Sequence, residues 1–126
     1  MRPESTKLPV KAGRALHAAE TLLCDGASDF AAGRAYYAMF YAAEAALADM
    51  GQQFRKHSGV HAAFGEYLAK PGLLDAKYHR WLLDAFDKRI LGDYSYEMDV
   101  DDAAAQEMLT QAREFVSAVE AFLVSR

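Results

Sequence analysis

One arginine lies at a position of the chain where a charge is unexpected. Tyr78, Leu82 and Arg89 recur at i, i+4 and i+11, so a helix through this segment would turn Arg89 toward the protein interior. A desolvated guanidinium needs an anionic partner, and its planar group of donors fits either a carboxylate or a phosphate. We therefore expect Arg89 to pair with Asp93 or Asp87, or to bind the phosphate of a ligand.

A second row of polar groups lies among aromatic residues earlier in the chain. Arg34, Tyr37, Tyr41 and Glu44 follow i, i+3, i+7 and i+10, which places a charged pair and two phenols along one side of a helix. One interpretation is a structural network of Arg and Glu. The other is a nucleotide pocket, in which the rings stack on a base and Arg34 or Arg89 binds phosphate.

The elements that would position these groups are all helices. Pro and Gly fall almost only between segments of helical period, and no segment alternates as a strand does. We expect an all-α domain over residues 1–126, an up-and-down bundle of four to five helices. The expected helices are Pro9–Cys24, Ser28–Met50, Ser58–Lys70, Leu74–Leu91 and a last one that Asp101 and Asp102 cap. Ser28 or Asp29 would cap the second helix and Ser58 the third, and Gly92–Val100 would form a turn.

Composition limits the classes of function. The chain has 126 residues, of which 52% are hydrophobic, enough for one domain with a real core. A net charge of -4 gives no overall basic field, so non-specific capture of long nucleic acid is not expected. The single Cys24 and the lack of an apolar leader predict a cytoplasmic protein. The apolar segment Ala35–Ala43 is far shorter than the ~20 residues of a membrane span, so we expect no membrane association.

Several chemistries lack the residues that they need. His57 and His61 are spaced i, i+4 and could share a metal ion. The expected Ser58 cap would, however, leave His57 outside the helix, and no third ligand lies nearby, so we predict no metal site. Nucleophile-elbow, Walker and dinucleotide motifs are also missing, and we expect no cofactor.

Three segments together resemble a known family. They are Gly33-Arg34-Ala35-Tyr36-Tyr37-Ala38-Met39-Phe40-Tyr41-Ala42-Ala43, then Lys56-His57-Ser58-Gly59-Val60, then Arg89 with Asp93-Tyr94. In this order they resemble the HEPN family of small helical domains, in its prokaryotic branch found beside minimal nucleotidyltransferases. The resemblance covers roughly residues 28–96. It implies a helical bundle, a homodimer, and an association with nucleotides or RNA, often in toxin–antitoxin pairs.

The sequence departs from the family's nuclease motif at one position. Many members are metal-independent ribonucleases that use an Arg, four to six further residues and a His, and Tyr94 stands here where that His would follow Arg89. A phenol with a pKa near ~10 is a poor base at neutral pH. The resemblance therefore implies a domain without ordinary ribonuclease activity, and whether it is an enzyme stays open. Arg55 and His61 have the motif's spacing but lie away from its place.

The resemblance also draws attention to Tyr96. In family members a Tyr just beyond the His is nucleotidylylated by the partner transferase, so Tyr96 is a candidate modification site. The alternative is that Tyr94 and Tyr96 close the end of the bundle while Arg89 pairs with Asp93.

These observations lead to one preferred function and two alternatives. We expect a cytoplasmic, dimeric domain that binds a nucleotide or serves as the interaction partner of a nucleotidyltransferase. Its cleft would be lined by Arg34, Tyr37, Arg89, Asp93 and Tyr94. The first alternative is an RNA-cleaving toxin that uses Arg89 with Tyr94, or Arg55 with His61. The second is a structural dimer with no ligand.

Overall fold

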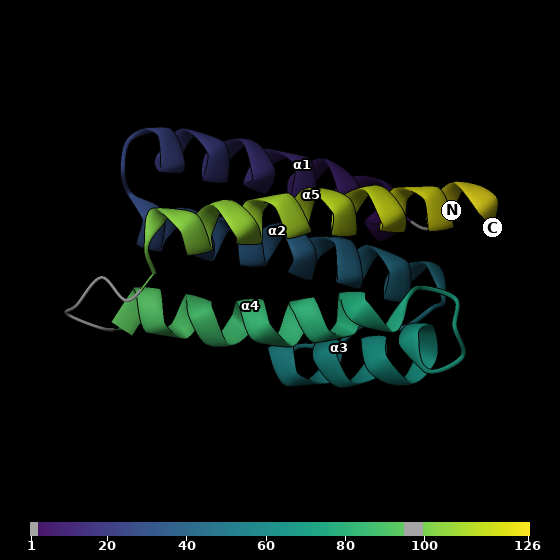
Figure 1. Cartoon of the computed structure of the whole chain (residues 1–126). Coiled ribbons are helices and arrows are strands. Elements are labelled where there is room, and N and C mark those ends of the chain that lie inside the picture. Colours follow the sequence, from purple (N-terminus) through teal and green to yellow (C-terminus); the bar gives the residue numbers. More distant parts are fainter. Residues whose placement is uncertain (1–2, 95–99) are drawn as a thin grey trace.

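The protein is a bundle of helices arranged around one central helix (Figure 1). The computed structural model describes residues 3–94 and 100–126, with side chains described for residues 6–90 and 100–126. The elements are α1 (Pro3–Cys24), α2 (Ser28–Asp49), α3 (His57–Phe64), the π-helical turn η1 (Gly65–Ala69), α4 (Ala76–Tyr94) and α5 (Asp102–Ser125). No strand occurs in these ranges. The all-α bundle expected from the sequence is confirmed.

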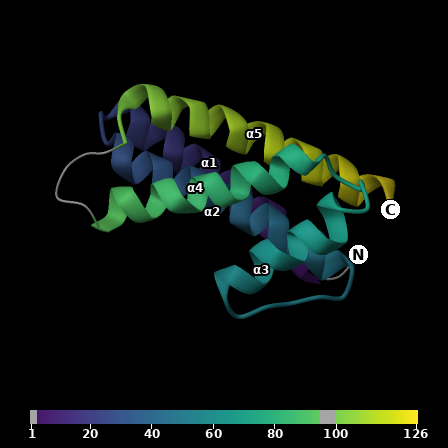
Figure 2. The same cartoon turned by 60° about the horizontal axis from the view of Figure 1, so that its bottom comes forward.

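Helix α2 occupies the centre because it is apolar almost all the way round. It contacts α1, α3, α4 and α5, and Figures 1 and 2 show it between α1 and α5 on one side and α4 on the other. Helix α3 lies beside the C-terminal half of α2 and the start of α4, and both chain ends lie toward the same end of the bundle. A helix of this kind must be enclosed by its neighbours to hide its surface from water.

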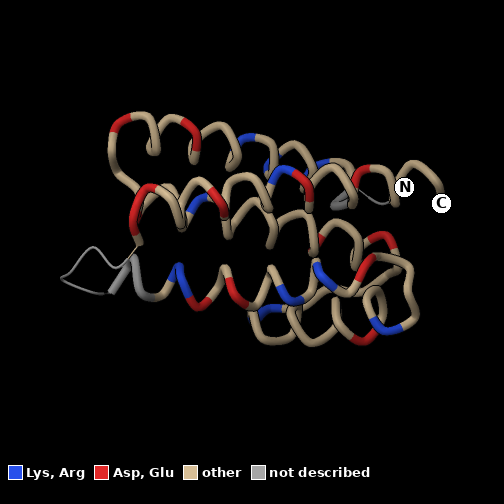
Figure 3. Tube along the Cα trace, in the orientation of Figure 1, with Lys and Arg blue, Asp and Glu red and all other residues tan. Residues whose placement is uncertain are grey.

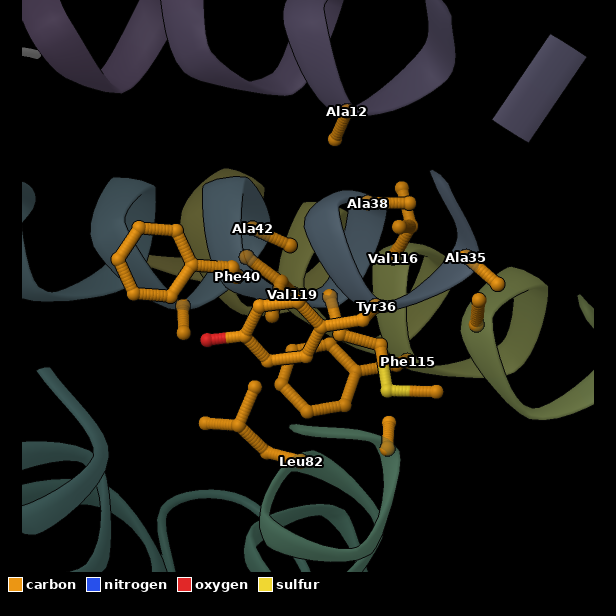
Figure 4. Close-up of a cluster of buried hydrophobic side chains, with 14 of the residues drawn as sticks. Ala12, Ala35, Tyr36, Ala38, Phe40, Ala42, Leu82, Phe115, Val116 and Val119 are labelled. Atoms are coloured by element: carbon orange, nitrogen blue, oxygen red, sulfur yellow. The ribbon is translucent and has the colours of Figure 1, made fainter. Parts of the chain in front are cut away.

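The core joins small residues of the central helix to larger side chains of its neighbours. Figure 4 shows Ala12 of α1 facing Ala38 of α2, with Val116 and Val119 of α5 close by. Phe115 of α5 is fully buried, and its ring lies 5.3 Å from that of Phe64 in α3. Short alanine side chains allow the helix axes to approach closely, and the aromatic rings fill the wider space beyond them.

Charged residues lie on the outer helices. Figure 3 shows acidic and basic residues interleaved along α4 and α5, with no long run of one sign. Within the part of the chain that the structure describes, no helix combines the length and the apolar character needed to cross a bilayer.

Two helices extend beyond the bounds expected from the sequence. Helix α1 begins at Pro3 and passes through Pro9, which was expected to start it. Pro9 is the seventh residue of this helix, so its missing N–H costs one backbone hydrogen bond in the second turn, and the helix continues through it. Helix α4 continues through Gly92 to Tyr94, so the expected break is wrong. A glycine weakens a helix but ends it mainly when it turns left-handed, as Gly26 and Gly51 do with φ of 80° and 81°.

Two of the expected caps are wrong and one is confirmed. Ser28 is the first residue of α2, after Ala27, and its hydroxyl donates to the Asp102 carboxylate instead of capping the helix. Helix α3 begins at His57, one residue before the expected cap Ser58, with no side-chain cap. Asp101 does cap α5, since its Oδ1 accepts from the backbone N of Ala104 at 2.8 Å. The third helix therefore includes His57 in its first turn, one turn before His61.

Candidate functional site

One tyrosine hydroxyl joins two histidines inside the bundle. The Tyr36 Oη lies 2.8 Å from His57 Nδ1 and 2.8 Å from His61 Nε2. Tyr36 is fully buried and His61 is 6% exposed, while His57 is half-buried at the start of α3. In Figure 4 the Tyr36 ring lies within the apolar core, and its hydroxyl points away from Ala35. Buried polar groups require partners, and these three supply each other.

Aromatic rings hold the two imidazoles in place. The His57 ring stacks on Phe40 with centroids 4.2 Å apart, and the His61 ring lies edge-on to Phe86 at 5.0 Å. Phe40 comes from α2 and Phe86 from α4, so three helices meet here. We call Tyr36, His57 and His61 with these two rings the Tyr36 cluster.

Burial keeps the cluster uncharged at neutral pH. It lowers the pKa of His61 to about 4, with smaller contributions from His57 and His79. Burial, and then the nearby Arg89 charge, lowers the pKa of His57 below its usual value. Burial also raises the pKa of the Tyr36 phenol. Both histidines therefore carry a lone pair that can accept a proton, and Tyr36 stays protonated.

The second part of the site is built on Tyr37. Arg89 Nη2 donates to the Tyr37 hydroxyl at 3.0 Å, and its guanidinium carbon lies 5.2 Å from the Tyr37 ring centroid. The Arg34 guanidinium lies 4.8 Å from the same centroid. The His57 ring meets Tyr37 edge-on at 5.8 Å, which links the two parts. We call Arg34, Tyr37, His57 and Arg89 the Tyr37 site.

This arrangement can attract an anion beside a neutral base. Each guanidinium carries about five N–H donors, and Arg89 donates one of its own to the Tyr37 hydroxyl. Arg34 is exposed and Arg89 is half-buried, so the Arg34 cation faces solvent and the Arg89 cation lies deeper in the Tyr37 site. A phosphate held by these groups would lie near His57.

A third histidine supports the cluster through the backbone. The Nε2 of His79, in α4, is hydrogen-bonded to the carbonyl oxygen of His61 at 3.0 Å. The His79 ring lies against Gly65, where an added Cβ would stand only 2.6 Å from its Cε1. Gly65 opens the π-helical turn η1, and turns of this kind recur at functional sites. Gly65 thus leaves the room that His79 needs to hold the end of α3.

The structure brings together three of the residues predicted to bind a nucleotide. Arg34, Tyr37 and Arg89 meet, and Arg89 turns inward as expected. Asp93 and Tyr94 belong to the last turn of α4, but their side chains lie outside the described residues, as does the whole of Tyr96.

Three other residues considered from the sequence, Tyr41, Glu44 and Arg55, lie outside the Tyr37 site. Tyr41 contacts the Tyr37 ring at 5.6 Å, and on α1 it meets the Lys11 ammonium, 4.5 Å from the Tyr41 ring centroid. Glu44 lies farther along α2 and lines a separate pocket. Arg55 is exposed on the loop before α3, whereas His61 is buried against Tyr36, so the structure gives no support to pairing them.

Tyr36 and His57 are site residues that the sequence did not predict. The i, i+4 spacing of His57 and His61 is the signal in the sequence that points to them, and the expected cap at Ser58, which places His57 outside the helix, hides it. Their shared partner is a phenol, and no group of three metal-ligating His, Cys, Asp or Glu side chains occurs among the described residues.

Comparison with known proteins assigns the chain to a family. The model of the HEPN domain matches residues 7–122. A UPF0332 protein of Gloeobacter violaceus is 37% identical over 98% of both chains. A protein of Methanocaldococcus jannaschii named "Putative toxin" is 31% identical over 98% of this chain and 84% of its own. A UPF0332 protein of Thermotoga maritima is 32% identical over 87% of this chain and 83% of its own.

Proposed function

Because the chain belongs to the HEPN family, we propose that it is the HEPN component of a toxin–antitoxin-like module and that its Tyr37 site binds a nucleotide. The observation that carries this proposal is the contact of two guanidiniums, Arg34 and Arg89, with the single ring of Tyr37. The name of the archaeal relative supports the toxin–antitoxin part.

The chemistry of the site suits a phosphate next to a flat base. Guanidiniums bind phosphate oxygens with two parallel hydrogen bonds, and aromatic faces stack on nucleobases. Tyr37 is half-buried, so part of the residue is exposed to solvent. Neutral His57 adds a hydrogen-bonding group without adding a charge to those of Arg34 and Arg89. Asp93 and Tyr94, one turn beyond Arg89 on α4, complete the proposed lining.

The proposal extends to two protein partners. The chain forms a homodimer, in which exposed Ile90 of α4 and the neighbouring Tyr37 site lie near the contact. Its second partner is a nucleotidyltransferase, which modifies Tyr96. Co-expression with the adjacent gene product and intact-mass measurement tests this part, since one added nucleotidyl group on wild type and none on Tyr96→Phe is expected.

Nucleotide binding is tested by titration calorimetry with AMP, ATP and inorganic phosphate. Arg89→Gln should weaken nucleotide binding by about tenfold or more, because it removes one charge-assisted contact. Tyr37→Leu should weaken the binding of AMP more than the binding of phosphate, because it removes the aromatic surface on which the base would stack. Arg80→Gln, an exposed position on the same helix, is the matched control and should change nothing. Equal binding by wild type and Arg89→Gln would refute the site.

A second function is favoured by the position of His57. Its Nδ1 is engaged by Tyr36, so Nε2 is the nitrogen that remains for a substrate. Its lowered pKa keeps the ring neutral at neutral pH, and Nε2 is unprotonated in the tautomer whose Nδ1–H donates to Tyr36. In a metal-independent endoribonuclease, Nε2 would take the proton of an RNA 2'-hydroxyl. The 2'-oxygen would then attack phosphorus, the bond to the 5'-oxygen would break, and the leaving 5'-oxygen would take up the proton held by His57, which gives a cyclic phosphate and a 5'-hydroxyl. Arg89 would stabilise the charge on the phosphate.

Ribonuclease activity is measured on short RNAs in the presence of a chelator. If this second function holds, His57→Asn should reduce cleavage by roughly 100-fold or more, the usual contribution of a general base. Arg55→Ala, outside the site, should leave cleavage unchanged. Absence of cleavage by wild type, together with nucleotide binding, would leave the first function alone.

A further inference from the structure

A pocket lies apart from the site described above. Its volume is about 370 Å³, it is open to solvent, and it is bordered by the N-terminal part of α1, the C-terminal half of α2, the loop before α3 and α3 itself. It is lined by Lys7, Leu8, Glu44, Leu47, Ala48, Gln52, Gln53, Phe54 and Val60. None of these residues belongs to the Tyr37 site or to the Tyr36 cluster. The volume lies near the lower end of the range of small-molecule pockets, so it suits a small ligand.

The chemical signal in this pocket is the carboxylate of Glu44. Glu44 is half-buried, and among the described residues no hydrogen bond or ion pair engages it. Burial raises the pKa of Glu44, and only the more distant charge of Lys11 opposes that effect. The Lys11 ammonium itself lies over the Tyr41 ring at 4.5 Å. A carboxylate in such surroundings is stabilised by a cation that enters the pocket.

Part of the pocket lining is hydrocarbon. Leu8, Leu47 and Val60 come from three different helices and are aliphatic members of this lining; Leu8 is partly exposed, while Leu47 and Val60 are each 1% exposed and lie behind the surface. Phe54 adds an aromatic ring that is 38% exposed. Its close approach to α3 depends on Gly59, where an added Cβ would stand 3.1 Å from the Phe54 Cβ. A ligand that fills this space must therefore carry an apolar body behind its charged group.

We propose that this pocket binds a small aliphatic ammonium compound, with the ammonium on Glu44 and a branched hydrocarbon body against Leu8, Leu47 and Val60. An anionic ligand would meet the Glu44 charge, and a neutral one would leave the carboxylate without a counter-charge. Lys7, which is exposed and also lines the pocket, could pair with a carboxylate on the same ligand. A ligand with both groups would be an apolar amino acid. Alkylamine and amino acid share the ammonium chemistry, and the experiment separates them.

The test uses isosteric ligands that differ only in their polar group. Isoamylamine, isoamyl alcohol, isovalerate and leucine are titrated into the full chain, and the methyl resonances of Leu8, Leu47 and Val60 are followed by NMR. Isoamylamine should shift these resonances and bind about tenfold more tightly than the alcohol, with isovalerate weakest. Leucine binding at least as tightly as isoamylamine would identify the zwitterion as the ligand class, and weaker binding would identify the simple alkylamine.

The matched variants are Glu44→Gln and Glu107→Gln. Glu44→Gln keeps the shape of the side chain and should remove the preference for amine over alcohol, while Glu107→Gln, exposed on α5, should keep it. The proposal is overturned if isovalerate binds as well as isoamylamine, if Glu44→Gln keeps the amine preference, or if no ligand shifts the three methyl groups. The wild-type ligand series stands by itself should Glu44→Gln fail to fold.

Discussion

The two sides of α2 are built from different materials. Toward α1 and α5 the contacts are made by alanines and branched aliphatic residues, such as Ala12, Ala38 and Val116, with no polar side chain between them (Figure 4). Toward α3 and α4 the contacts are rings joined by hydrogen bonds, centred on Tyr36 and His61. The packing around Ala12, Ala38 and Val116 supplies stability alone. The second side gives up part of that stability to hold imidazoles and a phenol in fixed positions, and it is the side next to the Tyr37 site.

The largest expected effect comes from emptying the centre of the core. Phe115→Ala should lower the free energy of unfolding by about 3–5 kcal/mol, because it leaves a cavity where a fully buried ring packed against Phe64 of α3 and Tyr78 of α4. Chemical denaturation measures this loss. Nucleotide affinity of the molecules that remain folded should not change, whereas a parallel loss of affinity would contradict the separation of this packing from the Tyr37 site.

The ring side should respond to pH where the apolar side cannot. His61 has a pKa of about 4 in the folded state against 6.5 as its ordinary value, so between these limits the unfolded chain binds a proton that the folded chain does not. Stability is therefore complete above pH 6.5 and decreases as pH falls toward 4, by up to about 3 kcal/mol, with His57 acting in the same direction.

Denaturation at a series of pH values measures this slope. His61→Gln keeps a hydrogen-bonding side chain but does not titrate here, so its profile should be flatter than that of wild type. An equal slope in both proteins would assign the effect to other groups.

Removing one oxygen tests the hydrogen bonds of the ring side. Tyr36→Phe should cost about 1–3 kcal/mol of unfolding free energy, because it takes the shared partner from two imidazoles in one step. Tyr78→Phe is the matched control, since the Tyr78 hydroxyl bonds to Glu114 at the surface, and its effect should be much smaller. Equal losses of unfolding free energy in the two variants would mean that the buried Tyr36 hydroxyl contributes no more to stability than the surface hydroxyl of Tyr78.

The smallest expected effect separates two glycines. Gly65→Ala should destabilise the protein by about 1 kcal/mol, since the new Cβ displaces His79 from the His61 carbonyl and outweighs the gain in helix propensity. Gly13→Ala, in α1 with nothing within 4 Å of the added Cβ, should instead stabilise it by up to about 1 kcal/mol. Thermal denaturation of both variants gives the two signs, and the same sign for both would contradict the packing role of Gly65.

Most of the fold could be predicted from the sequence because it depends on periodicity. Met108, Ala112 and Phe115 recur at i, i+4 and i+7 of the last helix, and all three are buried. The inward turn of Arg89 followed from the same argument. What periodicity cannot give is the end of a helix, where several weak preferences compete. Ser28 met Asp102 from a distant part of the chain instead of capping its own helix.

The candidate site could be predicted only in part, for the same reason. Arg34 and Tyr37 lie one turn apart on α2, so their contact is local and was foreseen. Tyr36 and His57 belong to different helices, and their meeting depends on how α3 packs against α2. The expected cap at Ser58 then removed His57 from consideration. Placing the start of α3 one residue too late therefore left out His57, whose ring links the Tyr36 cluster to the Tyr37 site.

The hydroxyl that Tyr36 places between two rings has a single hydrogen, and this restricts both histidines. If it donates to His61 Nε2, then His57 must donate from Nδ1, and the outer nitrogen of His57 is bare; the reverse choice puts a hydrogen there. The two imidazoles must therefore adopt complementary tautomers, and neither can switch alone. A buried residue that no ligand touches, His61, thereby sets whether His57 presents a base or a donor to whatever binds beside it.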